Sequence, residues 1–217
     1  MDLTPPGIRV LGCLVEKAMA TPQQYPLSVN ALQGACNQLT GRDPVVDYDE
    51  TTVRAGLDDL KQHQLVKAEY ARGSRTPKYA HRLTDQLDLD DPQMALLGLL
   101  MLRGDQTVGE LRGRAERMHI VGSLEEVDAT LQALATHRFG PLVVLLPRAP
   151  GQKEPRWAHQ LGGVAPVTDA SADPGQPVTP PPPGGRIDRL EGDVAALRVA
   201  VADLADQVRV LRDQAGA

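Results

Sequence analysis

The sequence predicts a mainly helical α+β protein made of two copies of one small domain, followed by a linker and a tail helix. Three observations predict this: a segment that occurs twice, helical apolar spacing that repeats with it, and a change of composition after residue 162. The segment at 73–83, GSRTPKYAHRL, returns at 151–161 as GQKEPRWAHQL, with five identical positions. An ungapped match of this length indicates two copies of a domain rather than a solenoid, whose period would be about 20 to 50 residues.

Three amphipathic helices are predicted at the start of each copy. Their apolar residues recur three and four positions apart, which places them on one face of a helix. In the first copy these residues are Leu11, Leu14 and Val15, then Val29, Leu32, Cys36 and Leu39, then Val53, Leu57 and Leu60. In the second copy they are Leu97, Leu100 and Met101, then Val108, Leu111, Ala115 and Met118, then Val127, Leu131 and Leu134.

Polar residues mark where the second and third helices of each copy begin. Ser28 and Asp49 are expected to N-cap them in the first copy, and Thr107 and Ser123 in the second. The spacing of Ser123 and Glu126 also predicts a capping box.

Two strands joined by a turn should end each copy. They are expected at 65–70 and 78–83, and again at 142–146 and 156–161, with glycine in both turns. The apolar pairs at 45–46 and 120–121 are predicted to add a short third strand. Three helices with a terminal hairpin form the winged helix-turn-helix plan. We therefore predict tandem winged-helix domains at 1–87 and 88–162.

The segment at 163–185 is predicted to be a disordered linker, partly in polyproline II conformation. It holds Pro177 and the run Pro180 to Pro183, and it has too few apolar residues to build a core. It separates the paired domains from the tail.

The tail at 186–214 has the heptad spacing of a coiled coil. β-Branched residues fill the a positions and leucines fill the d positions, which favours a parallel homodimer. The charges at 186 and 191, and at 193 and 198, would be complementary in that dimer. A lone amphipathic helix that packs on the body or on another protein is the alternative. The predicted seam is Ile187, Leu190, Val194, Leu197, Val201, Leu204, Val208 and Leu211.

Composition favours a reduced, cytoplasmic protein without metal or cofactor. The chain has formal net charge -5 and only two cysteines, Cys13 and Cys36, both on apolar helix faces and without metal-ligand spacing. The amino terminus does not have the pattern of a signal peptide, and no apolar stretch is long enough to span a membrane.

Charge points to duplex DNA as the ligand of the first copy. Residues 1–83 carry ten Lys or Arg and nine Asp or Glu, but residues 70–83 hold no acid. Cations on a glycine-containing turn are suited to phosphate contacts, and the third helix would approach base edges. The predicted phosphate contacts are Arg72, Arg75, Lys78 and Arg82, and the predicted base contacts are Thr51, Thr52 and Arg54.

Acidic residues weaken this DNA hypothesis. Asp49 and Glu50 suit a helix start, but Asp58 and Asp59 have no such role in the sequence. In the second copy, Glu125, Glu126 and Asp128 open the third helix and Glu154 interrupts the turn, so this copy is expected to face a protein partner. Its first helix, at 94–102, is apolar almost all round and is expected to pack against the first copy, with a dimer mate or another partner as the alternatives.

The first copy resembles the YceH-like proteins of bacteria. The matching stretches are CLVEK at 13–17, TPQQYPLSVNAL at 21–32, ACNQ at 35–38, RDPV at 42–45 and GSRTPKYAHR at 73–82. This resemblance implies paired winged-helix domains and carries no ligand, reaction or catalytic residue.

Catalysis is not expected, because the chain shows no phosphate loop, zinc motif or nucleophile motif. His81 and His159 are interpreted as hydrogen-bonded core residues rather than ligands or bases. Tyr25 and Pro26 should form a packed loop before the second helix. Asn37 and Gln38 are candidates for a recognition role, because loops often carry function.

Two functions remain open. The first is a dimeric, non-enzymatic, winged-helix regulator of transcription that binds DNA. The second is a scaffold whose paired winged helices bind proteins, as in accessory subunits of chromosome-condensing complexes. Fold alone does not separate these hypotheses.

Overall fold

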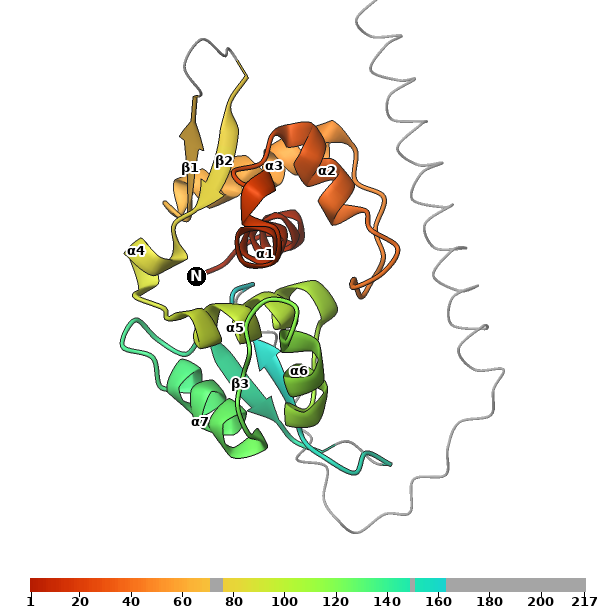
Figure 1. Ribbon diagram of the computed structural model, residues 1–217, viewed down its shortest axis with the longest axis vertical. Coiled ribbons are helices and arrows are strands. Elements are labelled where there is room, and N and C mark those ends of the chain that lie inside the picture. Colours follow the sequence, from red (N-terminus) through yellow and green to blue (C-terminus); the bar gives the residue numbers. More distant parts are fainter. Residues whose placement is uncertain (71–75, 149–150, 163–217) are drawn as a thin grey trace, which may run out of the picture. The chain divides into compact units, whose positions relative to one another are not determined.

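The computed structural model describes residues 1–70, 76–148 and 151–162, which belong to one compact unit. Within these residues the chain is α+β, with two separate antiparallel sheets of two strands each (Figure 1). Arg72 and Arg75, the linker predicted at 163–185 and the coiled coil predicted at 186–214, with its whole seam, lie outside the described residues.

The first half, residues 1–87, contains three main helices and a hairpin. In order these are α1 (Pro5–Ala20), the short 3-10 helix η1 (Pro22–Gln24), α2 (Val29–Cys36), α3 (Glu50–Gln62), β1 (Val66–Glu69) and β2 (Lys78–His81). A short helix, α4 (Leu83–Leu87), then leads into the second half.

The second half, residues 88–162, repeats the same order. It consists of α5 (Asp91–Arg103), α6 (Val108–Ala115), α7 (Leu124–Ala135), β3 (Val143–Leu146) and β4 (Arg156–His159). The two hairpins also have the same register, because Val66 lies opposite His81 and Val143 lies opposite His159. The repeat seen in the sequence is therefore a repeat of structure.

All four predicted N-caps are confirmed. The side chains of Ser28, Asp49, Thr107 and Ser123 each accept a hydrogen bond from a backbone N–H in the first turn. The predicted capping box of Ser123 is present, and Thr107 forms another. These bonds satisfy amide groups that the start of a helix leaves unpaired.

The predicted third strands at 45–46 and 120–121 are wrong. Val45 and Ile120 are exposed, and the segment before the second helix of each half pairs with the hairpin instead. Leu27 and Tyr79 exchange two backbone hydrogen bonds of 3.1 and 2.7 Å, and Gln106 and Trp157 exchange two of 3.0 and 2.7 Å. These bonds occupy the free edge of β2 and of β4.

The prediction that Leu39 lies on the buried face of the second helix is also wrong, because its side chain is 82% exposed. The helix ends at Cys36, and the next residue, Asn37, already has its side chain bonded to the backbone of Tyr48. The helical spacing of Leu39 therefore continued beyond the end of the helix.

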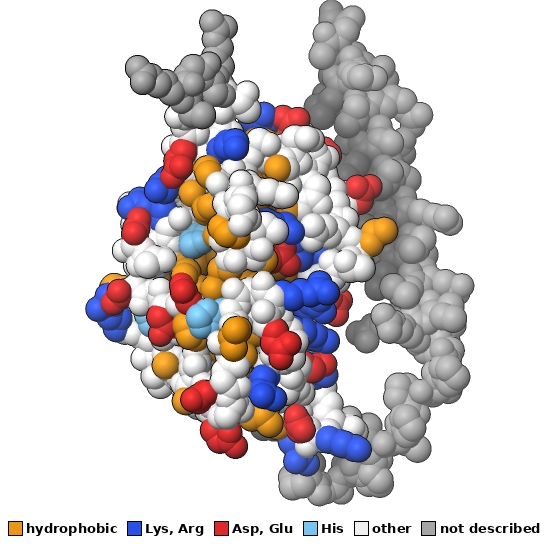
Figure 2. All heavy atoms as spheres, in the orientation of Figure 1, with side chains coloured by type: hydrophobic (Ala, Val, Ile, Leu, Met, Phe, Trp, Pro, Cys, Tyr) orange, Lys and Arg blue, Asp and Glu red, His pale blue; other side chains and the backbone are white. Residues whose placement is uncertain are grey.

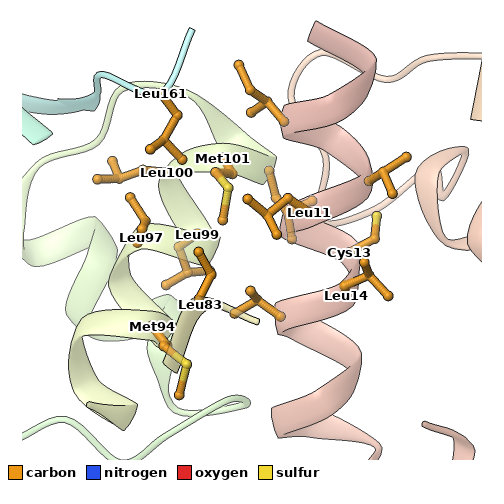
Figure 3. Close-up of a cluster of buried hydrophobic side chains, with 14 of the residues drawn as sticks. Leu11, Cys13, Leu14, Leu83, Met94, Leu97, Leu99, Leu100, Met101 and Leu161 are labelled. Carbon is orange, nitrogen blue, oxygen red and sulfur yellow. The ribbon is translucent and has the colours of Figure 1, made fainter. Parts of the chain in front are cut away.

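The hydrophobic core runs without a break from one half to the other. α1 and α5 lie side by side at its centre, and residues 94–102 of α5 are all buried, as its apolar composition predicted (Figure 3). Leu11 of α1 faces this cluster, whereas Cys13 and Leu14 lie on the side of α1 away from α5. The expected packing of α5 against the first half is confirmed.

Two glycines set how closely α1 and α5 approach. A Cβ atom added at Gly12 would lie 3.0 Å from Cγ of Leu102 and 3.1 Å from Cβ of Met101. A Cβ atom at Gly98 would lie 3.0 Å from Cγ1 of Val15. Because these separations are shorter than ordinary van der Waals contacts, larger residues would force the helices apart.

Backbone hydrogen bonds tie the halves together on either side of this helix pair. The Leu3 N–H donates to the Leu161 carbonyl at 2.8 Å, and the Asp43 N–H donates to the Leu102 carbonyl at 2.9 Å. The amino terminus and the loop after α2 are thus both attached to the second half.

We expect the substitution Gly12→Ala to destabilise the protein by about 1–3 kcal/mol, because the added methyl group overpacks the α1–α5 contact. Gly34→Ala is the matched control, because Gly34 lies in α2 with open space around its Cα. The control should be neutral or stabilising by up to about 1 kcal/mol through helix propensity. Urea unfolding of both variants measures the difference, and equal stabilities would contradict the close packing.

Candidate nucleic-acid interface

The outer face of α3 is the surface on which the sequence placed base contacts. Val53, Leu57 and Leu60 turn inward and are buried. This orientation leaves Thr51 and Arg54 exposed and Thr52 half-buried. Asp49 accepts a hydrogen bond of 2.8 Å from the Thr52 N–H, and hydrogen bonds from Thr52 lower the pKa of that carboxyl group. Asp49 is therefore the N-cap of α3, and this role explains why an acidic residue stands at this position.

Ion pairs balance the remaining charges on this face. Nη2 of Arg54 lies 2.6 Å from Oε1 of Glu50, and Nζ of Lys61 lies 2.8 Å from Oδ1 of Asp58. All four side chains are largely exposed. Exposed ion pairs at this helical spacing stabilise a helix by only about 0.3–0.5 kcal/mol. A phosphate group could therefore replace either carboxylate as the partner of Arg54 or Lys61.

Asp59 points away from the outer face of α3. Its Oδ2 accepts hydrogen bonds from the Thr4 N–H at 2.8 Å and from the Thr4 hydroxyl at 2.7 Å. Its Oδ1 lies 3.3 Å from Nδ1 of His63. Asp59 thus holds the start of α1, and the sequence could not reveal this role because Thr4 is 55 residues away.

The hairpin of the first half carries the predicted phosphate contacts that the structure describes. Lys78 is exposed at the start of β2, opposite Glu69 in the register. Glu69 itself pairs with Lys67 at 2.9 Å. Arg82 is half-buried, with its Nε 3.6 Å from Oδ2 of Asp85. On the face shown in Figure 2, Lys and Arg side chains over this hairpin alternate with Asp and Glu.

The side chain of Tyr79 in β2 contacts Lys61 in α3 and so joins these two elements. The Tyr79 ring is buried, and Nζ of Lys61 lies 5.6 Å from its centroid, within the range of a cation–π contact. The carboxyl-terminal end of α3 is therefore joined to the hairpin. The predicted base and phosphate contacts come from these two neighbouring elements.

The corresponding surface of the second half is acidic. α7 has Glu125, Glu126 and Asp128 and contains no Lys or Arg. Glu125 and Glu126 are exposed, and a hydrogen bond from Ser123 lowers the pKa of Glu125. The two third helices therefore differ in charge, because α3 carries both acidic and basic residues whereas α7 carries acidic residues alone.

Asn37 and Gln38 both make internal contacts. The Asn37 side chain accepts from the Tyr48 N–H at 2.8 Å and donates to the Tyr48 carbonyl at 2.8 Å, which closes the loop between α2 and α3. Gln38 accepts a hydrogen bond of 2.9 Å from Arg42. These bonds favour a role in shaping the loop.

Arg42 is the residue of this loop that sequence reasoning missed. Its guanidinium is buried and forms a bidentate pair with Glu16, with distances of 3.1 and 2.6 Å. Burial raises the pKa of Glu16, but hydrogen bonds and charge from Arg42 outweigh this effect and lower it. Nothing in the spacing of residues 16 and 42 indicates this pair.

His81 and His159 occupy equivalent places in the two hairpins. Each is half-buried, and each has a buried Nδ1 without a hydrogen-bond partner among the described residues. The expected side-chain hydrogen bond is therefore missing at that atom. The backbone N–H of His81 donates to the Tyr25 hydroxyl at 2.6 Å, which confirms that Tyr25 packs in its loop.

The described part of the chain holds no cluster of three or more His, Cys, Asp or Glu side chains placed to bind a metal ion. Cys13 and Cys36 are free and buried. Within the described ranges, no helix has the length and apolar character needed to cross a bilayer.

Comparison with known proteins places the chain among bacterial relatives. A family model described as "Protein of unknown function, DUF480" matches residues 3–152. A UPF0502 protein of Opitutus terrae is 47% identical over 191 residues, covering 88% of this chain and 81% of its own length. A UPF0502 protein of Azoarcus sp. is 45% identical over 213 residues, covering 98% and 94%. The latter similarity extends beyond residue 162.

We expect stability to fall as the pH drops below about 6.5, because the pKa values of His81 and His159 are lowered by burial. The unfolded chain then binds protons that the folded chain excludes, so the contribution is complete above the unfolded pKa and decreases below it. Nearby Asp85 and Asp105 oppose the shifts only partly.

Urea unfolding at pH 7 and pH 5 measures this effect. In a double variant, His81→Phe with His159→Phe, the difference between the free energies of unfolding at pH 7 and pH 5 should be smaller. An unchanged difference, or histidine resonances that titrate above pH 6.5, would contradict the assignment.

Proposed function

The chain belongs to the DUF480 family of proteins of unknown function, and we propose that it is a non-enzymatic winged-helix protein that binds duplex DNA through its first half. In this proposal α2 and α3 form the helix-turn-helix, and the β1–β2 hairpin is the wing. α3 packs on α1, α2 and β1 while its outer face stays exposed, as a recognition helix requires.

The contrast between the outer faces of α3 and α7 carries the proposal. α3 presents Arg54 and Lys61 with hydroxyl groups at its start, whereas α7 presents carboxylates alone among its charged residues. Asp59, one of the acidic residues that argue against DNA binding, accepts hydrogen bonds from Thr4 and does not lie on this outer face. The outer face of α3 therefore carries fewer unpaired negative charges than the sequence indicated.

In the proposed complex, Thr51, Thr52 and Arg54 approach base edges in the major groove. Lys78, Arg82 and the predicted wing residues Arg72 and Arg75 hold phosphates. Glu50 releases Arg54 when DNA arrives, because their exposed ion pair is weak.

A dimer would strengthen this binding. The heptad pattern at 186–214 predicts a parallel homodimer, and the linker predicted at 163–185 would join each body to it. Two linked DNA-binding domains gain effective concentration without fixing the spacing of half-sites. This arrangement suits a dimeric, cytoplasmic regulator of transcription.

Fluorescence anisotropy with a mixed-sequence duplex at several salt concentrations tests the proposal. A triple variant, Arg72→Ala, Arg75→Ala and Lys78→Ala, should bind more weakly and reduce the salt dependence by about three released counterions. The matched control is Arg148→Ala with Lys153→Ala, which removes exposed cations from the hairpin region of the second half. Binding that is absent at low salt, or equal in the triple variant and the wild type, would contradict DNA binding through the wing.

Exposed apolar residues of the second half favour a second function, that of a protein scaffold. Four large hydrophobic side chains are exposed there, namely Ile120, Leu124, Phe139 and Leu145. Leu124 opens the acidic helix α7. An apolar residue beside carboxylates suits a protein partner with a basic rim rather than DNA.

A pulldown after nuclease treatment tests this scaffold function. It should retain one stoichiometric protein, and Leu124→Asp should release it because a charge is buried without a partner. Recovery of nucleic acid alone in the untreated sample, or equal retention by Leu124→Asp, would argue against the scaffold.

A further inference from the structure

A cavity of about 870 Å³ opens where the two halves meet, away from α3 and the hairpins. The first half contributes the carboxyl-terminal end of α1 and the loop after α2. The second half contributes the end of α5, α6 and the turn that follows it. Its volume lies within the range of about 300–1,000 Å³ that is typical of small-molecule sites.

Cations dominate the walls of this cavity. Lys17, Arg103, Arg114 and Arg117 line it, together with the carboxylates Glu16 and Glu116. Figure 2 shows Lys and Arg side chains gathered at this level of the molecule, beside the ends of α5 and α6. The chain as a whole is acidic, with formal net charge -5, so this concentration of positive charge is local.

Glu16 does not pair with the arginines that line the cavity. Glu16 is already paired with the buried Arg42 and lies 3.3 Å from Nζ of Lys17. Neither Arg103 nor Arg117 has an ion pair or hydrogen bond with any residue that the structure describes. Arg114 donates to Gln106 at 2.6 Å, and its Nη2 lies 3.6 Å from Oε1 of Glu110. Two guanidinium groups therefore remain available for a ligand.

The arginines also repel one another. Burial lowers the pKa of Arg103, and the nearby charges of Arg114, Arg42 and Arg117 lower it further, while Glu16 opposes them. The carboxyl ends of α5 and α6 offer partial negative charge to their terminal arginines. Even so, the other arginines still depress the pKa of Arg103, and an anion would relieve this repulsion.

Apolar side chains form part of the remaining surface of the cavity, beside the polar Gln38 and Thr40. Leu99 and Leu102 of α5 and the half-buried Met118 line it, and Leu39 stands at its edge with 82% of its surface exposed. A ligand with a flat apolar portion beside its charged groups could cover Leu39.

We propose that this cavity binds a small molecule that carries two or more phosphate groups, held by Arg103, Arg114 and Arg117 of the second half and Lys17 of the first. Guanidinium groups bind phosphate oxygens through paired, charge-assisted hydrogen bonds. The ligand chemistry is that of a di- or triphosphate, either inorganic or attached to a nucleoside. This site is independent of DNA binding through the first half.

The arrangement of the cations suits a compact polyphosphate rather than a duplex. They converge on one hollow from both halves, whereas the phosphates of one DNA strand follow one another along about 3.4 Å of helix axis per step. A ligand that contacts Lys17 and Arg103 together would bridge the halves and stabilise their packing.

Isothermal titration calorimetry of the full chain with pyrophosphate, ADP and adenosine tests the proposal. Pyrophosphate and ADP should bind, and adenosine should not. Arg103→Gln and Arg117→Gln should each weaken binding about tenfold, because each removes a charge-assisted hydrogen bond. Arg148→Gln is the matched control, since Arg148 is exposed and does not line the cavity.

Two further measurements identify the source of the phosphates and guard against misfolding. Equal affinity for ADP and pyrophosphate assigns the site to phosphate groups alone, whereas tighter ADP binding that Leu39→Ala abolishes assigns it to a nucleotide. Arg117→Gln, at an exposed position, keeps the test valid if thermal unfolding shows that Arg103→Gln does not fold.

Three results would overturn the proposal. The first is no binding of either phosphate compound at millimolar concentration. The second is equal binding by the Gln variants and the wild type. The third is loss of duplex binding, instead of pyrophosphate binding, in the Arg103→Gln and Arg117→Gln variants.

Discussion

The close contact between α1 and α5 is the constraint on which the rest of the structure depends. Gly12 and Gly98 let the two helices approach more closely than side chains would permit. The buried leucines around them join the cores of both halves into one cluster (Figure 3). Burial of apolar area is the main favourable contribution to folding, and α1 and α5 bury part of that area between the halves. The repeat therefore acts as one folded unit.

This contact also places the two surfaces proposed for binding. In Figure 1 the first hairpin and α3 lie on one side of the central helices α1 and α5, and the second half lies on the other. The ends of α1, α5 and α6 line the cationic cavity. Arg42 and Glu16 fix the loop that forms one wall, and the Asp43 N–H ties that loop to α5. A ligand in the cavity would bind both halves at once, so its binding energy would add to their packing.

Features that depend on neighbouring residues could be predicted from the sequence. Helix stripes, the four N-caps and both hairpins follow from local spacing, and the repeat doubled the signal for each. Features that depend on distant residues could not. Leu27 pairs with Tyr79 and displaces the strand expected at 45–46, and Asp59 reaches back to Thr4. The cationic cavity was missed for the same reason, because Lys17 and Arg103 come from different halves.

The most direct test of this account is whether both halves unfold together in urea. The single tryptophan, Trp157, is buried in the second half, and both cysteines, Cys13 and Cys36, are buried in the first. Tryptophan fluorescence and thiol labelling thus report on different halves. The account predicts one transition with the same midpoint for both probes, since a shared core unfolds cooperatively. Two separate midpoints would show that each half folds alone, and would contradict the central role of the α1–α5 contact.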